Sequence, residues 1–137
     1  MKNTILLSLA VVFSLPAVAQ TCGQHLDVGL PSYQSDQVLC RDGYAVGYNY
    51  QMKNADWVAY HITADSVNAS YKRSNSFKED TELPDYARST LADYSGSGYD
   101  RGHLAPSATM DFSQESMTQS FLMSNMSPQL PGFNRVG

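Results

Sequence analysis

Alternating apolar and polar residues mark two short segments of this chain as β-strands. Residues 44–50 alternate in this way and hold three tyrosines, and residues 57–63 follow a similar pattern that begins with Trp57. Residues 53–56, between them, are rich in turn-forming side chains. The pattern therefore predicts a β-hairpin made of these two segments.

The flanking segments predict less regular structure. Residues 20–39 are polar and contain Gly29 and Pro31, so they predict a surface arm. Residues 64–98 have almost no apolar period and predict a long loop, which in a compact domain is usually functional or disordered.

The C-terminal part predicts short elements of both kinds. It predicts a strand, a helix, a second strand and the start of a further helix, at residues 99–104, 113–120, 121–123 and 131–134. A turn at Pro106 would follow the first of these strands, and Asp111 or Ser113 would cap the first helix. The mixture, with strands leading, predicts an α+β domain.

The N-terminus reads as a secretory signal peptide. Lys2 gives a positive start, residues 5–15 are apolar, and Ala17, Val18 and Ala19 form a small-x-small cleavage site. An uncleaved anchor is the alternative. No later segment reaches the ~20 apolar residues of a membrane span. We therefore expect residues 1–19 to be removed and residues 20–137 to form one secreted or periplasmic domain with no membrane segment.

The net charge limits the kind of partner. The whole chain carries a formal charge of −4, and removal of Lys2 with the leader makes the remainder more acidic. An acidic chain is a poor non-specific binder of nucleic acid, which argues against a histone-like protein. It does not exclude an enzyme that holds a single phosphate with local positive charge.

Cys22 and Cys40 are the only cysteines. An even count in an exported chain favours a disulfide, with two free thiols as the alternative. Closing this loop would stabilise the fold by about 3 kcal/mol. The spacing does not match a CxxC redox or zinc motif.

His103 is the first candidate for chemistry. It follows Asp100, Arg101 and Gly102, and a neutral imidazole can take a proton from water near neutral pH. Gly102 would permit a close backbone approach beside it. The alternative is a histidine whose hydrogen bonds are satisfied at a strand end. Asp100 could orient a neighbouring side chain or pair with an arginine. His25 and His61 have no such context, and His61 is expected to be a packed or edge residue of the 57–63 strand.

Asn134, Arg73 and Arg101 are the other candidates. An asparagine carbonyl suits Mg²⁺, which prefers oxygen ligands, although Asn134 could equally cap a helix. A guanidinium stabilises the charge that builds up on phosphorus during phosphoryl transfer. Arg101 lies inside the histidine motif, whereas Arg73 could instead be a solvated surface residue.

Three blocks, in order, carry a family resemblance. They are residues 98–106, residues 124–129 with the sequence Ser-Asn-Met-Ser-Pro-Gln, and residues 133–135. With residues 38–44 they resemble the DNA/RNA non-specific endonuclease family, which are secreted nucleases of the ββα-metal (His-Me finger) fold. The resemblance covers residues 38–135 and implies that the catalytic helix only begins where the chain ends, so we expect an N-terminal, C-terminally truncated portion of that fold.

The resemblance also implies roles. His103 would be the general base and Asn134 the ligand of Mg²⁺, or of Mn²⁺. Arg73 and Arg101 would hold the phosphate and stabilise the transition state. Asn125 would support the site and belong to the substrate-binding residues, although simple turn chemistry before Pro128 also explains an Asn there. DNA and RNA would be the substrates.

Two rival functions remain open at this point. One is a related phosphodiesterase that acts on smaller esters with the same residues. The other is an inactive secreted remnant or binding module. The sequence gives no indication of the oligomeric state.

Overall fold

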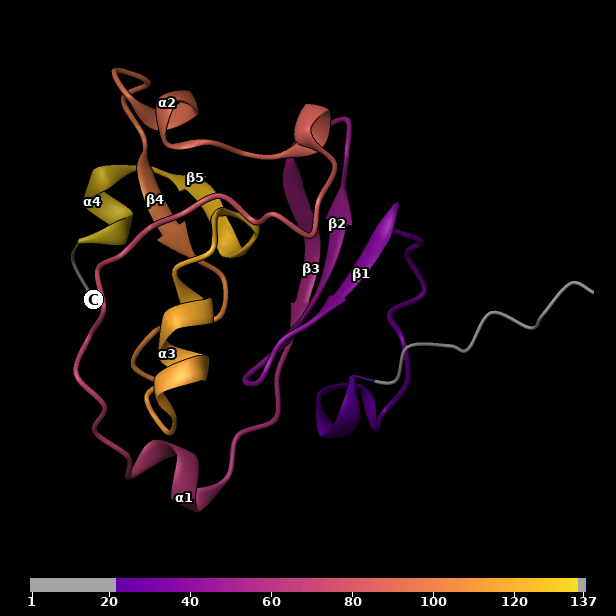
Figure 1. Ribbon diagram of the computed structural model, residues 1–137, viewed down its shortest axis with the longest axis vertical. Helices are drawn as coiled ribbons and strands as arrows, with labels where there is room; N and C mark the ends of the chain where they lie inside the picture. Colours follow the sequence, from indigo (N-terminus) through magenta and orange to yellow (C-terminus); the bar gives the residue numbers. More distant parts are fainter. Residues whose placement is uncertain (1–21, 136–137) are drawn as a thin grey trace, which may run out of the picture.

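Two antiparallel sheets organise residues 22–135, the part of the chain that the computed structural model describes (Figure 1). The first has the order β1-β2-β3, with β1 at Gln37–Cys40, β2 at Ala45–Asn49 and β3 at Asn54–Ala59. The second pairs β4, Asp100–His103, with β5, Met126–Gln129. Contacts between β3 and β5 join the sheets. The prediction of an α+β fold with antiparallel strands is confirmed, and the predicted leader lies outside the described residues.

All the described helices are short. The α-helices are α1 (Ala64–Val67), α2 (Leu91–Tyr94), α3 (Gln114–Ser120) and α4 (Pro131–Asn134), and the 3₁₀ turns are η1 (Gly23–Leu26), η2 (Asp85–Ala87) and η3 (Met123–Asn125). Ser113 caps α3 through its hydroxyl, as predicted. Thr63 caps α1 and Thr90 caps α2, and both of these helices lie within residues 64–98, which were predicted to be a loop. None of the described helices has the length and apolar character that crossing a membrane requires.

The core lies against β2, the central strand of the first sheet. Its first four residues are buried, so both faces of the strand are covered. The largest buried side chains there are Tyr44 and Tyr48. Each phenol donates a hydrogen bond to a backbone carbonyl, Tyr44 to Gln119 at 2.8 Å and Tyr48 to Ala87 at 3.1 Å. Burial raises the pKa of both phenols, so they stay neutral donors that fasten the sheet to distant segments.

The predicted hairpin exists, but its boundaries differ from the prediction. The turn occupies residues 50–53, where Lys53 has a φ of 48°, and residues 54–56 belong to β3 rather than to the turn. β3 ends at Ala59, so His61 lies beyond the strand and is exposed. The prediction of a surface arm over residues 20–39 was wrong at its end. Gln37–Cys40 forms β1 because it pairs with β2 along its whole length.

Gly47 gives a direct test of packing in this sheet. A Cβ at this position would lie 2.2 Å from Cε2 of the Trp57 ring, which stands opposite it on β3. We expect Gly47→Ala to lower the free energy of unfolding by about 1–3 kcal/mol, because the bulky ring must move. Gly132→Ala is the matched control, since nothing lies within 4 Å of its Cβ position. Urea unfolding compares the two, and equal stability in both variants would contradict the packing.

The strand predicted at residues 121–123 is not formed. Residues 121–123 form a turn and the start of η3, and only Leu122 makes an isolated bridge, to Lys78. All three side chains are buried, whereas an extended strand would send alternate side chains to opposite faces. The strand lies just beyond, at Met126–Gln129. It tolerates Pro128 because β5 has a single partner strand, β4.

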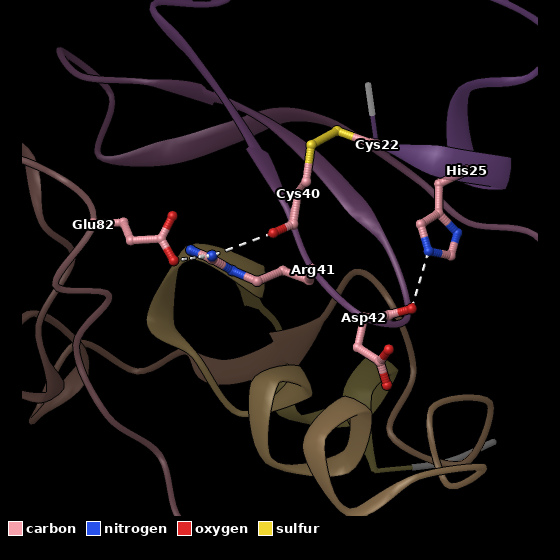
Figure 2. Close-up of a disulfide and its surroundings, with 6 residues drawn as sticks. All are labelled: Cys22, His25, Cys40, Arg41, Asp42 and Glu82. Carbon is pink, nitrogen blue, oxygen red and sulfur yellow. Dashed lines mark hydrogen bonds and ion pairs between the residues drawn. A yellow bond between two sulfur atoms is a disulfide. The ribbon is translucent and has the colours of Figure 1, made fainter. Parts of the chain in front are cut away.

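The N-terminal arm is fastened to the first sheet (Figure 2). A disulfide joins Cys22 to Cys40 at the end of β1, which confirms the predicted bridge. His25 lies within hydrogen-bond distance of the Asp42 carbonyl, 3.1 Å from Nε2, and its Nδ1 accepts from the backbone N–H of His61 at 3.2 Å. His25 thus serves as a structural link between the arm, the β1–β2 turn and the end of β3.

Candidate active site

A cleft of about 1090 Å³ opens beside β4, and we call it the catalytic cleft. The four residues predicted to act as base, phosphate contacts and metal ligand line it, namely Arg73, Arg101, His103 and Asn134, and Asp100 lines it as well. They come from three separate parts of the chain: the irregular segment after α1, the strand β4, and α4. In Figure 1, α4 lies beside β4, and the two elements are in contact.

Strand pairing fixes the position of His103. On β4 it stands opposite Met126 of β5, and Gly102 stands opposite Ser127. A Cβ on Gly102 would lie 1.9 Å from Cδ of Gln129, so the glycine allows the close approach that the sequence predicted. The imidazole is therefore carried by paired backbone rather than by a loop, which is what a general base needs to keep one orientation.

Two aromatic rings enclose the His103 imidazole. The Phe121 ring meets it edge-on, with centroids 4.9 Å apart, and the Phe77 ring lies 5.8 Å away. Burial, helped by the positive charge of Arg73, lowers the pKa of His103 to about 4. Its Nε2 is buried and finds no hydrogen-bond partner among residues 22–135. A buried nitrogen left unpaired costs free energy, so it marks His103 as a candidate for function.

Each of the two arginines stacks on one of these rings. The Arg101 guanidinium carbon lies 4.2 Å from the centroid of Phe77, and that of Arg73 lies 5.0 Å from Phe121. Arg73 also donates to the Ser107 hydroxyl and, at 2.7 Å, to Asn75. Arg73 is exposed, but these contacts hold its side chain at the wall of the cleft.

A backbone bridge holds the Arg73–Phe77 segment against the site. The N–H of Lys78 donates to the Phe121 carbonyl at 3.2 Å, and the Lys78 carbonyl accepts from Met123 at 2.9 Å. Phe77 and Phe121 therefore come side by side, with ring centroids 4.9 Å apart. This long-range pairing explains how a segment without secondary structure can place an arginine beside His103.

Asp100 organises the opposite end of the cleft. It receives two hydrogen bonds from Arg135, at 2.6 and 2.7 Å, and one from Nδ2 of Asn134 at 3.3 Å. These donors, Arg135 first, lower the pKa of the Asp100 carboxyl below its ordinary value. Because Nδ2 of Asn134 is used in this way, its Oδ1 is the atom left for another partner. The prediction that Asp100 pairs with an arginine or orients a neighbour is confirmed in both senses.

Asn125 does not contact the cleft, so its assignment as a substrate-binding residue was wrong. Its side chain is fully buried, with a relative exposure of 0%. It accepts from the N–H of Ala105 at 2.8 Å and donates to the carbonyls of Ala105 and Ser120, both at 2.9 Å. All its hydrogen bonds go to backbone, so it holds the chain that follows His103 in place.

Phe77, Phe121 and Ser107 were missed by the sequence reasoning as parts of the site. Their role depends on contacts across the fold, and no local spacing connects them to His103. Only the position of Ser107, just after the turn at Pro106, lies near the motif in sequence.

The described residues contain no cluster of three or more His, Cys, Asp or Glu side chains that could cage a metal ion. A hydrated Mg²⁺ needs fewer protein ligands than such a cluster provides, because it keeps several waters and often uses only one or two protein ligands plus substrate phosphate. Oδ1 of Asn134, left free by Asp100 and placed in the same cleft as His103, fits that limited role.

Comparison with known proteins shows the family to which the chain belongs. The model of the DNA/RNA non-specific endonuclease family matches residues 22–137. The chain belongs to this family. It is 47% identical to nuclease C1 of Cunninghamella echinulata var. echinulata over 114 residues, covering 80% of the chain and 45% of that protein. It is 36% identical to human mitochondrial endonuclease G, covering 82% of the chain and 38% of that protein.

A solved structure shares the fold. A chain from a crystal structure of the EndoG/EndoGI complex superposes with a TM-score of 0.77 at 34% identity, covering 87% of this chain and 50% of that one. The ββα-metal fold predicted from the family motifs is confirmed at this level. This chain spans about half the length, or less, of these members of the family.

Proposed function

We propose that the protein hydrolyses phosphodiester bonds of DNA and RNA with the help of a divalent metal ion. The observation that carries the proposal is the meeting of His103, Arg73, Arg101 and Asn134 in one cleft. The neutral imidazole can serve as a base, and the two guanidinium groups can contact the phosphate. The amide oxygen of Asn134 can serve as a metal ligand. Membership of the endonuclease family supports the same substrates.

His103 acts as the general base. A ring nitrogen accepts a proton from water, the water oxygen forms a bond to phosphorus, and the bond from phosphorus to the leaving 3′ oxygen breaks. The low pKa of His103 keeps the imidazole neutral, and so able to accept this proton, throughout the physiological pH range.

Arg73 and Arg101 hold the phosphate in the cleft that His103 also lines. Each is stacked on an aromatic ring, which restricts its motion before substrate arrives. A guanidinium held in place stabilises the extra negative charge of the pentacoordinate phosphorus without reorganisation. Both residues also offset the acidic balance of the chain at the place where the polyanion must bind.

Asn134 would hold the metal ion, which we propose is Mg²⁺, with Mn²⁺ as the alternative. When bound, the ion supplies positive charge to the phosphoryl group and to the leaving oxygen. The task of this chain's own residues is to orient the ligand. Asp100 holds the amide of Asn134, and Arg135 holds Asp100.

Export is a separate proposal and rests on residues 1–19. The leader-like sequence and the disulfide between Cys22 and Cys40 both suit an oxidising compartment outside the cytoplasm. Curated members of the family include mitochondrial proteins, so the destination needs its own test. Fractionation of cells that express the full chain should recover a product that starts near Gln20, and a cytosolic product that retains Met1 would contradict export.

The proposed function is tested with purified protein, plasmid DNA and a structured RNA. Both nucleic acids should be fragmented with Mg²⁺ present, EDTA should stop the reaction, and added Mg²⁺ should restore it. Activity that persists in EDTA would contradict the metal. Hydrolysis of small diesters alone, with intact DNA and RNA, would favour the smaller-ester alternative, and no hydrolysis would favour the inactive module.

The pH dependence of cleavage should reflect His103. Because its pKa is lowered from 6.5 to about 4, the neutral base persists in mildly acidic solution. We expect kcat/KM for plasmid to stay nearly flat from pH 7 down to about 5.5, and to fall only as the pH approaches 4. An NMR titration of the His103 ring, assigned by its loss in His103→Ala, gives the same pKa independently. An acid limb centred at 6.5 in both measurements would contradict the enclosed geometry.

A further inference from the structure

A second hollow adjoins the catalytic cleft, and we call it the side pocket. It has a volume of about 390 Å³. The side chains that matter here are Lys53, Asn54, Ser89, Tyr94, Tyr99 and Pro128. Tyr94 and Tyr99 also line the catalytic cleft, so the two tyrosines form the boundary between the two spaces.

The boundary tyrosines belong to a well-fixed loop. Tyr94 ends α2, and Tyr99 directly precedes β4. Between them the Ser97 hydroxyl donates to the Tyr94 carbonyl at 2.9 Å and accepts from the Tyr99 N–H at 3.1 Å. Gly96 and Gly98, on either side, take φ values of 72° and 82°, which side chains disfavour. The loop is therefore built to hold these two residues close to the motif that carries His103.

Tyr99 presents an aromatic surface that the described residues leave uncovered. Its relative exposure is 49%, although the neighbouring Arg101 is stacked on Phe77 and Asp100 is paired with Arg135. Tyr99 thus offers part of its ring to solvent, beside the strand that carries Arg101 and His103.

The chemistry of the side pocket matches a nucleobase. A base has two flat faces and an edge of hydrogen-bond donors and acceptors. The lining of the side pocket includes the rings of Tyr94, Tyr99 and Pro128 and polar groups on Lys53, Asn54 and Ser89. Asp93 also lines it, but one oxygen of its carboxylate already accepts hydrogen bonds from Thr90. Aromatic side chains that stack on bases are a general means of binding single-stranded nucleic acid without sequence preference, because every base has a π-face.

We propose that the side pocket binds the base of a nucleotide next to the scissile phosphate, with Tyr99 as its stacking surface and Tyr94 behind it. This inference rests on the proposed function, because the phosphate must lie at His103, Arg73 and Arg101 for the neighbouring base to reach the tyrosines. The protein then binds a nucleic-acid strand at two points. Arginines bind the backbone and tyrosines bind a base that has left its stack, so unpaired strands bind better than duplex.

The test measures binding without cleavage, in protein that carries His103→Ala. Fluorescence anisotropy gives the Kd for a labelled single-stranded oligothymidylate and for an abasic oligonucleotide of the same length. Tyr99→Ala should weaken binding of the oligothymidylate about tenfold and leave binding of the abasic strand unchanged. Tyr99→Phe keeps the ring and should bind both strands as the parent does.

Tyr86→Ala is the matched control, because Tyr86 is 70% exposed but lines neither space. It should leave both affinities unchanged. Equal losses on the base-bearing and abasic strands in Tyr99→Ala, or the same loss in Tyr86→Ala, would overturn the side-pocket proposal. The comparison of the two strands in the parent protein needs no change to Tyr99, so equal affinities there would overturn it even if Tyr99→Ala misfolds.

Failure of the proposed function gives a different result. The protein with His103 intact would not fragment plasmid in Mg²⁺, and the His103→Ala protein would bind neither strand. Fragmentation of plasmid together with no preference for base-bearing strands would reject the side pocket alone. If the protein binds duplex better than single strands, the proposal that an unpaired base stacks on Tyr99 is likewise rejected.

Discussion

Replacing His103 by alanine should lower the rate of plasmid cleavage by at least about 100-fold, the lower end of what a positioned general base contributes. The imidazole is the only histidine in the catalytic cleft, as far as the described residues show. Its replacement removes the base and leaves Arg73, Arg101 and Asn134 in place to bind phosphate. The loss should therefore appear mainly in kcat, while affinity for the polymer changes little.

A second histidine provides the control. His61 lies beyond β3, is exposed, and contributes only its backbone N–H to the hydrogen bonds of the described residues. His61→Ala should cleave plasmid at the parent rate. Both variants should keep the circular dichroism spectrum and the cooperative unfolding of the parent. Cleavage by His103→Ala at a rate close to that of His61→Ala would remove His103 from the mechanism, and with it the proposed role of the cleft.

The motif predicted one wall of the site well because that wall is local. Asp100, Arg101 and His103 lie on one short strand, so their order in sequence fixes their relation in space. The expected helix start at residues 131–134 places Asn134 beside the same strand, as the structure shows. Sequence reasoning could predict these positions without knowing the rest of the fold.

The other wall could not be predicted, because it depends on contacts between distant segments. Phe77 and Phe121 meet around His103 only through the bridge between Lys78 and Leu122. The apolar run at 121–123 indicated a strand, but its side chains are all taken into the core. β1 was missed for a similar reason. Gln37–Cys40 is short and partly polar, and what makes it a strand is its pairing with β2.

The loss of one partner from a buried ion pair that no motif indicated is expected to destabilise the fold strongly. Arg41 and Asp80 lie in contact, Nη2 to Oδ2 at 2.6 Å, with side-chain exposures of 3% each. Asp80 also accepts from the Ser124 hydroxyl at 2.5 Å and from the Glu82 N–H at 3.2 Å. Burial opposes the charge on Arg41, but the two carboxylates outweigh it and raise the pKa of Arg41 above its ordinary value. The first sheet is joined in this way to the segment after Phe77.

Asp80→Ala should lower the free energy of unfolding by about 3–5 kcal/mol, because it leaves the Arg41 charge buried without its buried partner. That is a large share of the roughly 5–15 kcal/mol that stabilises a domain. Glu82→Ala is the matched control. Glu82 pairs with the same guanidinium, as Figure 2 shows, but its side chain is 58% exposed, so its loss should cost no more than about 1 kcal/mol.

Urea unfolding of the two variants separates the contributions, provided the slope of the transition is unchanged. The comparison is informative because both substitutions remove one carboxylate from one arginine and differ in burial. Because Ser124 adjoins Asn125, which holds the chain after His103, Asp80→Ala should also reduce cleavage at temperatures where its fold begins to open. Equal, small losses of stability in both variants would show that solvent reaches Arg41, and that the junction between the first sheet and the catalytic segment is held by apolar packing instead.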